Sequence, residues 1–101
     1  MIDRKLVIEI DQELASIVPG FLENRRKECM LIEELVSAGN MKELHILGHR
    51  MKGAGGSYGF DEISEIGEVL EIAAQEADTA NITTARKRLE EYLQRITVVY
   101  V

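Results

Sequence analysis

The chain has 101 residues, of which 46% are apolar, and its formal net charge is −6 at pH 7. This length predicts a single domain over residues 1–101, with its core at about residues 10–96 and extended or linking ends at 1–9 and 97–101. The acidic charge disfavours nucleic acid, whose phosphates attract clustered lysine and arginine. No apolar run is long enough to cross a bilayer and no signal peptide is evident, so we expect a cytoplasmic domain that makes no membrane contact.

Cys29 is the only cysteine, so no disulfide can form within the chain. It lies on an apolar face of an expected helix, where a buried thiol usually serves as a small hydrophobic residue. With one cysteine and two histidines, a closed structural zinc site is not expected.

The chain opens on a β-prone stretch at residues 6–10, which we expect to be an extended arm. Asp11 can cap a short leading helix of about residues 11–17. A long helix should follow at residues 19–38, because Pro19 suits the first turn of a helix.

Gly39 fits the end of that first long helix. Its apolar stripe is interrupted by Arg25, which we expect to extend its charged group into water. Asn40 and Glu43 then form a capping box at the start of the next helix, expected at residues 40–58.

Gly59 can end this second helix in the left-handed region. Asp61 can cap a third helix of about residues 61–77, and Asn81 can start a fourth of about residues 81–96.

The last residues, 97–101, are apolar and β-branched. They could pair with the β-prone start, pack on the helices, or mark the cut edge of a longer protein, and the sequence leaves all three open. Four long amphipathic helices with short connections predict an all-α fold, an antiparallel up-down four-helix bundle with a short leading helix.

The second helix has two distinct faces when its residues are placed at about 100° each. His49 falls opposite the core stripe, with His45, Gly53 and Gly56 near it and Lys52 one turn away. The residues of the core stripe are Leu44, Leu47, Gly48, Met51, Gly55 and Tyr58.

Glycine inside a helix costs about 1 kcal/mol relative to alanine. Gly48 and Gly55 lie on the packing side, where they can allow close helix approach. Gly53 and Gly56 lie on the exposed side, where missing side chains would open the approach to His49. An exposed histidine that is largely neutral near pH 7 is a candidate nucleophile, and phosphoryl transfer depends mainly on positioning and positive charge. Lys52 can supply that charge.

Two segments resemble the histidine-containing phosphotransfer (HPt) domain of two-component phosphorelays. One is His49-Arg50-Met51-Lys52-Gly53 with Gly56 and Tyr58-Gly59-Phe60, and the other is Pro19-Gly20-Phe21-Leu22-Glu23-Asn24-Arg25-Arg26. Leu70-Glu71 in the third helix also fits, so the resemblance covers about residues 10–96. Met51 stands where leucine is common in the family, a core exchange that is usually tolerated.

The resemblance implies that His49 accepts a phosphoryl group from an aspartate of a receiver domain and passes it to another receiver aspartate. It implies that Lys52 lies near the phosphoryl oxygens and that Gly53 and Gly56 keep the approach open. It also implies a carrier without kinase activity of its own, not an enzyme, and without a cofactor, since the magnesium ion of the transfer belongs to the receiver. The expected partners are receiver domains of a hybrid sensor kinase or a response regulator, and the expected state is a monomer.

Two other functions remain as alternatives: a helical adaptor that docks a receiver or kinase without phosphorylation, and a metal-binding bundle. His45 and His49 have the i, i+4 spacing of a two-histidine metal pair, but no third ligand is evident and no metal site is expected. His45, Arg50 and Ser57 are expected instead at the partner surface, beside the two exposed glycines.

Overall fold

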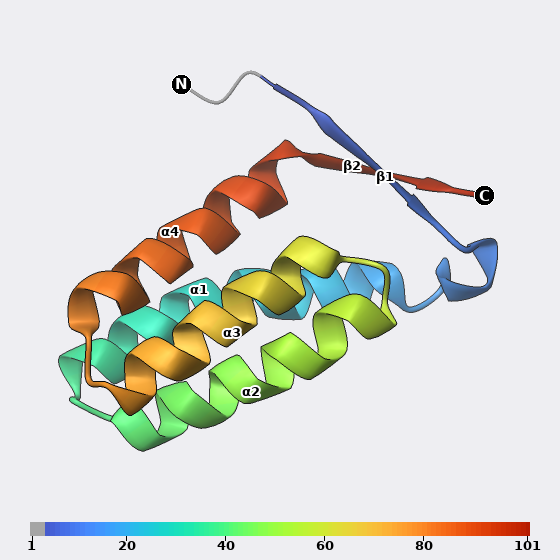
Figure 1. The fold of residues 1–101 in the computed structure, drawn as a ribbon. Coiled ribbons are helices and arrows are strands. Elements are labelled where there is room, and N and C mark those ends of the chain that lie inside the picture. The colour runs from blue at the N-terminus through green and yellow to red at the C-terminus, as the bar shows by residue number, and fades with distance from the viewer. Residues whose placement is uncertain (1–3) are drawn as a thin grey trace.

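The computed structural model describes residues 4–101 and is mainly helical (Figure 1). Its elements in chain order are β1 (Leu6–Ile10), the 3₁₀ turn η1 (Gln12–Leu14), α1 (Val18–Ser37), α2 (Met41–Ser57), α3 (Asp61–Gln75), α4 (Thr79–Arg95) and β2 (Ile96–Tyr100). Four helices confirm the predicted all-α bundle, and a short strand pair at the two chain ends is added to it.

The helices are joined by short connections that lie at alternate ends, which is the arrangement an antiparallel bundle requires (Figure 1). Each helix contributes an apolar stripe to one shared core. The fully buried large side chains of this core are Phe60, Ile10, Ile32, Leu44, Met51, Ile63, Ile66, Leu70, Ile82, Leu89 and Val18. Among the described residues, none of the helices combines the length and the apolar character needed to cross a membrane.

The predicted ends of α2 are confirmed at both sides. The Asn40 side chain accepts a hydrogen bond from the Glu43 main-chain N–H at 3.2 Å and so caps the helix, but the Asn40 N–H donates to the Leu35 carbonyl and not to Glu43, so only half of the predicted capping box forms. Gly39 and Gly59 have φ values of +68° and +90°, so each reverses the chain where residues with a side chain are strained. These stops fix where the motif helix begins and ends.

The predicted start of α3 at Asp61 is confirmed although its predicted cap is not, and the predicted start of α4 at about Asn81 is two residues late, because α4 begins at Thr79. Asp61 is the first residue of α3 and not its cap, since the N-cap position is held by Phe60, whose burial fixes the chain there. Asp78 caps α4 by accepting from the Asn81 main-chain N–H at 3.1 Å, so Asn81 lies in the first turn.

The predicted leading helix is reduced to the 3₁₀ turn η1. Asp11 does cap it, accepting the Glu13 N–H at 2.8 Å. However, α1 already begins at Val18, so few residues are left between the strand and the bundle. One tight turn is enough to redirect the chain.

The two β-prone ends pair with one another, which was one of the possibilities that the sequence left open. β1 and β2 are parallel, in register from Leu6 opposite Ile96 to Ile10 opposite Tyr100. Parallel strands need a long crossover, and here the whole helical bundle provides it. Residues 1–3 of the expected extended end lie outside the described residues.

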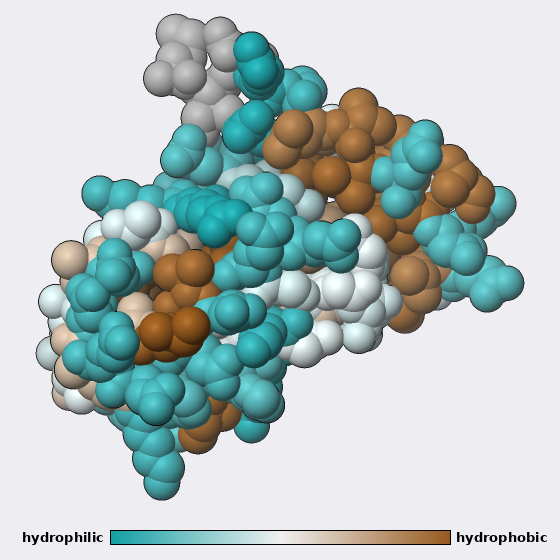
Figure 2. Space-filling view, viewed as in Figure 1, coloured by the Kyte–Doolittle hydropathy of each residue, from teal (hydrophilic) through white to brown (hydrophobic). Residues whose placement is uncertain are grey.

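The strand pair has one face toward the bundle and one toward solvent. Leu6 and Ile8 are half-buried and pack against the core, whereas Val7 and Val99 alternate outward and are exposed. Figure 2 shows hydrophobic surface gathered at the end of the molecule where β1 and β2 lie.

Arg25 does not extend into water as the sequence suggested. Its side chain is only 12% exposed, and its guanidinium lies 4.6 Å from the centre of the Phe21 ring. It donates to a Glu28 carboxylate oxygen at 2.9 Å. Burial raises the pKa of Glu28, although Arg25 and Arg50 lower it. The pair therefore belongs to the packing of α1 and not to its solvated face.

Candidate functional site

His49 projects from α2 into solvent, with 71% of its side chain exposed. The adjacent core stripe is buried as expected: Leu44, Leu47, Gly48, Met51 and Gly55 are all inaccessible, and Tyr58 is half-buried. The structure thus places the histidine on the opposite side of the helix from the residues that hold α2 in the bundle.

Glu71 of α3 is the residue that meets the His49 ring. The Nδ1 atom of His49 lies 2.9 Å from Oε2 of Glu71, whose side chain is only 16% exposed. An ionised carboxylate can only accept a hydrogen bond, so the proton of the neutral imidazole must be on Nδ1. The other ring nitrogen, Nε2, is therefore left with its lone pair, and the ring is oriented by a half-buried group.

Lys52 lies beside the same carboxylate. Its Nζ atom is 3.9 Å from Oε1 of Glu71 and 3.8 Å from Oε2 of Glu68. Its side chain is about half-exposed, so it can turn toward a bound anion. In this conformation its charge is shared by two carboxylates, and the role predicted for it at the phosphoryl oxygens requires it to leave them.

Glycines set the close approach of α2 and α3, which pack along one another (Figure 1). A Cβ atom on Gly48 would lie 2.5 Å from the main-chain nitrogen of Glu71 and 2.9 Å from the carbonyl oxygen of Gly67. Real side chains do not approach so closely, so only glycine fits here. The packing role predicted for Gly48 is confirmed, and this contact is what brings Glu71 within reach of His49.

Ser64 of α3 clamps the last turns of α2. Its hydroxyl donates to the Lys52 carbonyl at 2.7 Å and accepts the Gly56 N–H at 2.7 Å. A Cβ atom on Gly55 would lie 2.5 Å from the Ser64 main-chain nitrogen, so Gly55 also has the predicted packing role. The glycine-rich end of the helix is thereby held by its neighbour, since its own sequence favours a helix only weakly.

The two exposed glycines differ from one another. A Cβ atom on Gly53 would meet nothing within 4 Å, so this position is open to solvent. A Cβ atom on Gly56 would make an ordinary contact with the Ser64 hydroxyl at 3.4 Å, so this position is less open than that of Gly53. The predicted role of both in partner access stays a prediction.

The remaining predicted surface residues lie close to the histidine along α2. Arg50 is exposed, and the Ser57 hydroxyl donates to the Gly53 carbonyl at 3.1 Å. His45 is different, because it leans toward α3. Its Nδ1 atom is 3.3 Å from the Glu71 carbonyl oxygen, and its Nε2 atom is 3.9 Å from Oε2 of the same residue.

The site therefore combines an exposed imidazole on a helix, a carboxylate that orients it, a lysine one turn away and an open glycine. The family model described as Hpt domain matches residues 9–97. The chain belongs to the Hpt domain family. Neither the curated proteins nor the solved structures contain a significant match to it.

Membership in this family confirms the resemblance read from the sequence, and it covers nearly the whole chain. Hpt domains have a phosphotransfer role in two-component signalling, where they interact with receiver domains and act as phosphocarriers. The helical bundle of this Hpt domain holds His49 at its surface, with 71% of the side chain exposed.

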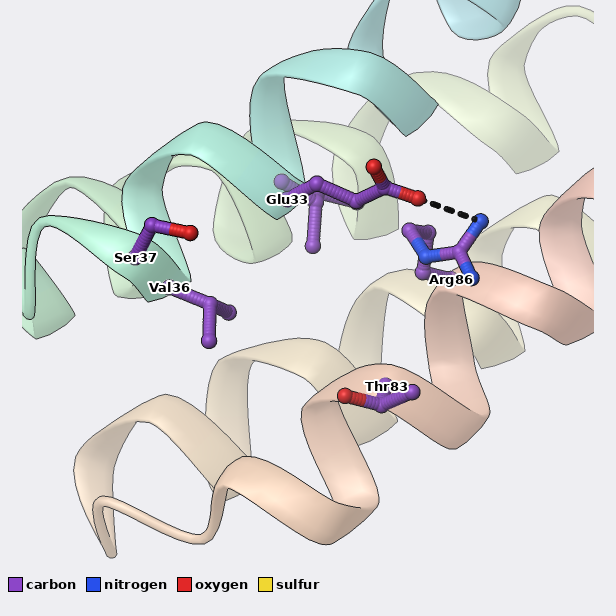
Figure 3. A pocket seen from close by; sticks show the side chains of 6 residues that line it. Glu33, Val36, Ser37, Thr83 and Arg86 are labelled. Carbon is purple, nitrogen blue, oxygen red and sulfur yellow. Dashed lines mark ion pairs between the residues drawn. The ribbon is translucent and has the colours of Figure 1, made fainter.

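A hollow of this Hpt domain lies away from the histidine, between α1 and α4 (Figure 3). Ser37 and Thr83 line it. The Nη1 atom of Arg86 lies 3.2 Å from Oε1 of Glu33 and 3.1 Å from Oε2 of Glu90. Because two carboxylates already face the arginine, the hollow does not attract an anion. It has no part in the site around His49.

Two site residues of this Hpt domain were missed by sequence reasoning. Glu71 appeared only as part of the family resemblance, with no role, and Ser64 was not noticed. Both lie on α3, and both reach α2 across the glycine contact. Their polar positions beside the buried residues Ile63 and Leu70 were the available signal, but spacing along one helix does not reveal which residue of another helix it meets.

Proposed function

We propose that this Hpt domain is a phosphorelay intermediate in which His49 accepts a phosphoryl group from a receiver aspartate and passes it to another receiver aspartate. The observation that carries the proposal is the 2.9 Å contact between His49 Nδ1 and Glu71, on a side chain that is 71% exposed. This contact leaves Nε2 as the free nucleophile and turns it toward solvent, where a partner can reach it.

The proposed step forms one bond and breaks one. The Nε2 lone pair attacks phosphorus of the acyl phosphate, a P–N bond forms, and the P–O bond to the aspartate breaks with its electrons leaving on the carboxylate. Because the ring keeps its Nδ1 proton, it becomes positively charged. The Glu71 carboxylate faces that proton and stabilises the charge. Return transfer to a second receiver is the reverse of these events.

The positive charge that stabilises the phosphoryl oxygens during transfer is proposed to come from two sources. Lys52 is close enough to His49 along the helix to turn toward the oxygens. The magnesium ion is expected on the receiver, and no cofactor is expected on this chain. The negative charges of Glu68 and Glu71 together exceed the positive charge of Lys52, so the free site does not attract an anion by itself. The partner must therefore bring the magnesium ion together with the phosphoryl group.

The proposed docking surface is the exposed face of α2 around the histidine. Gly53 leaves an opening beside His49, and Arg50 and Ser57 border it. A receiver needs only shallow contact here, which suits a transient complex of modest area. A single site of this kind functions in a monomer, and no contact with nucleic acid or membrane is part of the proposal.

The test is phosphoryl uptake from a phosphorylated receiver. We expect the parent protein and His45→Gln to acquire label that is lost in acid and retained in base, as a phosphoramidate is, and His49→Gln to acquire none. His45→Gln is the matched control, because it removes the other histidine of the chain. Labelling of His49→Gln at the parent level would overturn the proposal.

Two further measurements, receiver binding and metal content, separate the alternatives. A non-phosphorylated adaptor would bind the receiver equally well with and without His49 and would transfer nothing onward. A metal-binding bundle would contain stoichiometric metal after purification. Within residues 4–101 no group of three or more ligand side chains gathers, so nothing in the described structure favours that alternative.

A further inference from the structure

The strand β2 has two edges, and only one of them is paired in the described part of the chain, because the sheet consists of β1 and β2. At the paired edge the Val101 N–H donates to the Ile10 carbonyl at 2.9 Å, and the Val101 carbonyl accepts the Gln12 N–H at 2.9 Å. Main-chain groups of successive residues in a strand point to opposite edges. The N–H and carbonyl groups of Val98 and Tyr100 therefore face the unpaired edge.

This edge of β2 lacks the charged side chains that usually block exposed strands. No residue of β2 is charged. Two residues on its solvent side are apolar, since Val99 is 42% and Val101 is 65% exposed. β1 differs, because Glu9 lies within it and Lys5 directly precedes it. An uncharged, apolar edge pairs readily with another strand, so the edge of β2 is the one that can accept a partner.

The charges around the strand pair are divided between its two ends. The end where both strands begin is mainly basic, and the end where they finish is acidic. The residues are Arg4, Lys5 and Arg95 with Glu91 at the first end, and Asp11 and Glu13 at the second. An antiparallel copy of the same strand pair would place the basic end of each copy beside the acidic end of the other, whereas a parallel copy would bring like charges together. The charge pattern thus complements itself in one orientation.

We propose that the open edge of β2 is an interface for a second copy of this chain, whose own β2 adds antiparallel and completes a four-stranded sheet about a two-fold axis. Opposed residues in such a sheet must point to the same face and direct their main-chain groups at one another. These conditions are met when Val99 lies opposite Val99 of the second copy. Val98 then lies opposite Tyr100 of the second copy, and each such pair exchanges both of its main-chain hydrogen bonds.

The register is selected by the groups that remain available. A shift that placed Val98 opposite Val98 would oppose Tyr100 to Ile96, whose N–H is already bonded to the Tyr92 carbonyl. In the proposed register every group that meets the second copy is free, and Val99 forms the close, non-hydrogen-bonded pair on the axis.

The proposed pairing leaves the site at His49 open. In Figure 1, α2 and β2 lie on opposite sides of the bundle. Because α4 leads directly into β2, the two-fold axis directs the two α4 helices away from one another. The transfer proposed above needs a single site, so the pairing does not depend on it and each copy retains that site. One short strand buries less area than a stable interface, so we expect a weak dimer with a Kd on the order of 0.1–1 mM.

Sedimentation equilibrium of the full chain from about 0.02 to about 2 mM measures the association. We expect the mean mass to rise from monomer toward dimer over this range. Amide hydrogen exchange locates the interface: the N–H groups of Val98 and Tyr100 should gain protection as the concentration rises. A monomer throughout the range, or a dimer in which these two groups gain no protection, would overturn the proposal.

Substitutions of Val99 test the register. Val99→Lys and Val99→Glu each place like charges opposite one another on the axis, so each alone should raise the Kd at least about tenfold. An equal mixture of the two should associate as well as the parent, because lysine then faces glutamate. This recovery also shows that both variants fold. A mixture that stays as weak as its components would contradict the pairing of Val99 with itself.

Val7→Lys is the matched control, because it adds the same charge to the solvent face of the sheet but on β1, away from the open edge of β2. We expect its Kd to stay within about twofold of the parent value. A loss equal to that of Val99→Lys would show that the sheets associate through their faces and would overturn edge pairing. Tyr100→Pro removes an N–H at the open edge while sparing the bonds to β1, so it should also weaken the dimer. Parent-level association of that variant would count against the hydrogen-bonded edge.

Discussion

Gly48 of α2 lies directly against the main chain of Glu71 in α3, so closely that a Cβ atom on Gly48 would be 2.5 Å from the Glu71 nitrogen. The residue before the histidine in the sequence therefore sets how near the Glu71 carboxylate comes to the ring. Any side chain at position 48 would push α3 away from α2, and this would also move the Glu71 carboxylate away from the His49 ring.

Gly48→Ala tests this relationship. We expect it to lower the free energy of unfolding by about 1–3 kcal/mol, because the methyl group meets backbone that cannot move aside cheaply. We also expect the downfield NMR shift of the His49 Nδ1–H proton to decrease, because its hydrogen bond to Glu71 is weakened or lost. Denaturant unfolding and ring NMR measure the two effects.

Gly53→Ala is the matched control for helix propensity. Position 53 has open space, so alanine should raise the free energy of unfolding by up to about 1 kcal/mol. If a receiver docks over this position, transfer should nevertheless slow while phosphorylation by phosphoramidate stays unchanged. A Gly48→Ala variant as stable as Gly53→Ala would contradict the packing argument.

Glu71→Ala should slow phosphoryl uptake by His49 by about tenfold, because a hydrogen bond to a charged group contributes about 1.5–3 kcal/mol and part of it is lost to water. The uptake rate of Glu71→Gln should lie between those of the parent and Glu71→Ala, since the glutamine amide oxygen still accepts a hydrogen bond from His49 Nδ1. The rate is followed by label incorporation. Glu68→Ala serves as control, because Glu68 contacts Lys52 alone among the site residues, and an equal loss there would point to general charge and not to orientation of the ring.

Arg25→Met should destabilise the protein by about 2–4 kcal/mol at pH 7, because it leaves a largely buried Glu28 carboxylate without its partner. Burial raises the pKa of Glu28 in the parent, and losing Arg25 raises it further. A group with a raised folded pKa favours the protonated form, so the loss should shrink as pH falls from 7 to 5. Chemical unfolding at both pH values checks this, and Arg25→Met/Glu28→Gln should be more stable than Arg25→Met.

Tyr92 should make the fold sensitive to alkali. Burial, with the nearby negative charges of Glu62 and Asp61, raises the pKa of Tyr92 to about 12. The ordinary pKa of tyrosine is about 10, so between pH 10 and 12 the tyrosine ionises in the unfolded chain but stays neutral in the folded one. The contribution of Tyr92 to stability is therefore complete below pH 10 and is lost as pH rises toward 12. We expect the free energy of unfolding to fall by roughly 2–3 kcal/mol over this interval. Tyr92→Phe should remove that loss, and an unchanged pH profile would contradict the role of Tyr92.

Much of the fold was predictable because it depends on local sequence. Helix periodicity identified the buried stripe of α2, and the cap at Asn40 and the stops at Gly39 and Gly59 followed from backbone chemistry. The predicted start of α3 at Asp61 was confirmed, although Phe60 and not Asp61 holds the N-cap position. The start predicted at Asn81 was two residues late, because both Asp78 and Asn81 can cap a helix and Asp78 is the one that does. The prediction that Arg25 extends into water was wrong, because its guanidinium packs against the Phe21 ring and donates a hydrogen bond to Glu28.

By itself, the sequence determined that His49 points away from the core, that Lys52 lies one turn away, and that glycines occupy both faces of the helix. These facts follow from a fixed rotation per residue along one helix. Only the tertiary structure decided that Glu71 meets the ring, that Ser64 holds the end of α2, and that the two chain ends pair as strands. Such contacts join residues far apart in the chain, and their geometry is set by how closely α2 and α3 can pack, which helical periodicity does not encode.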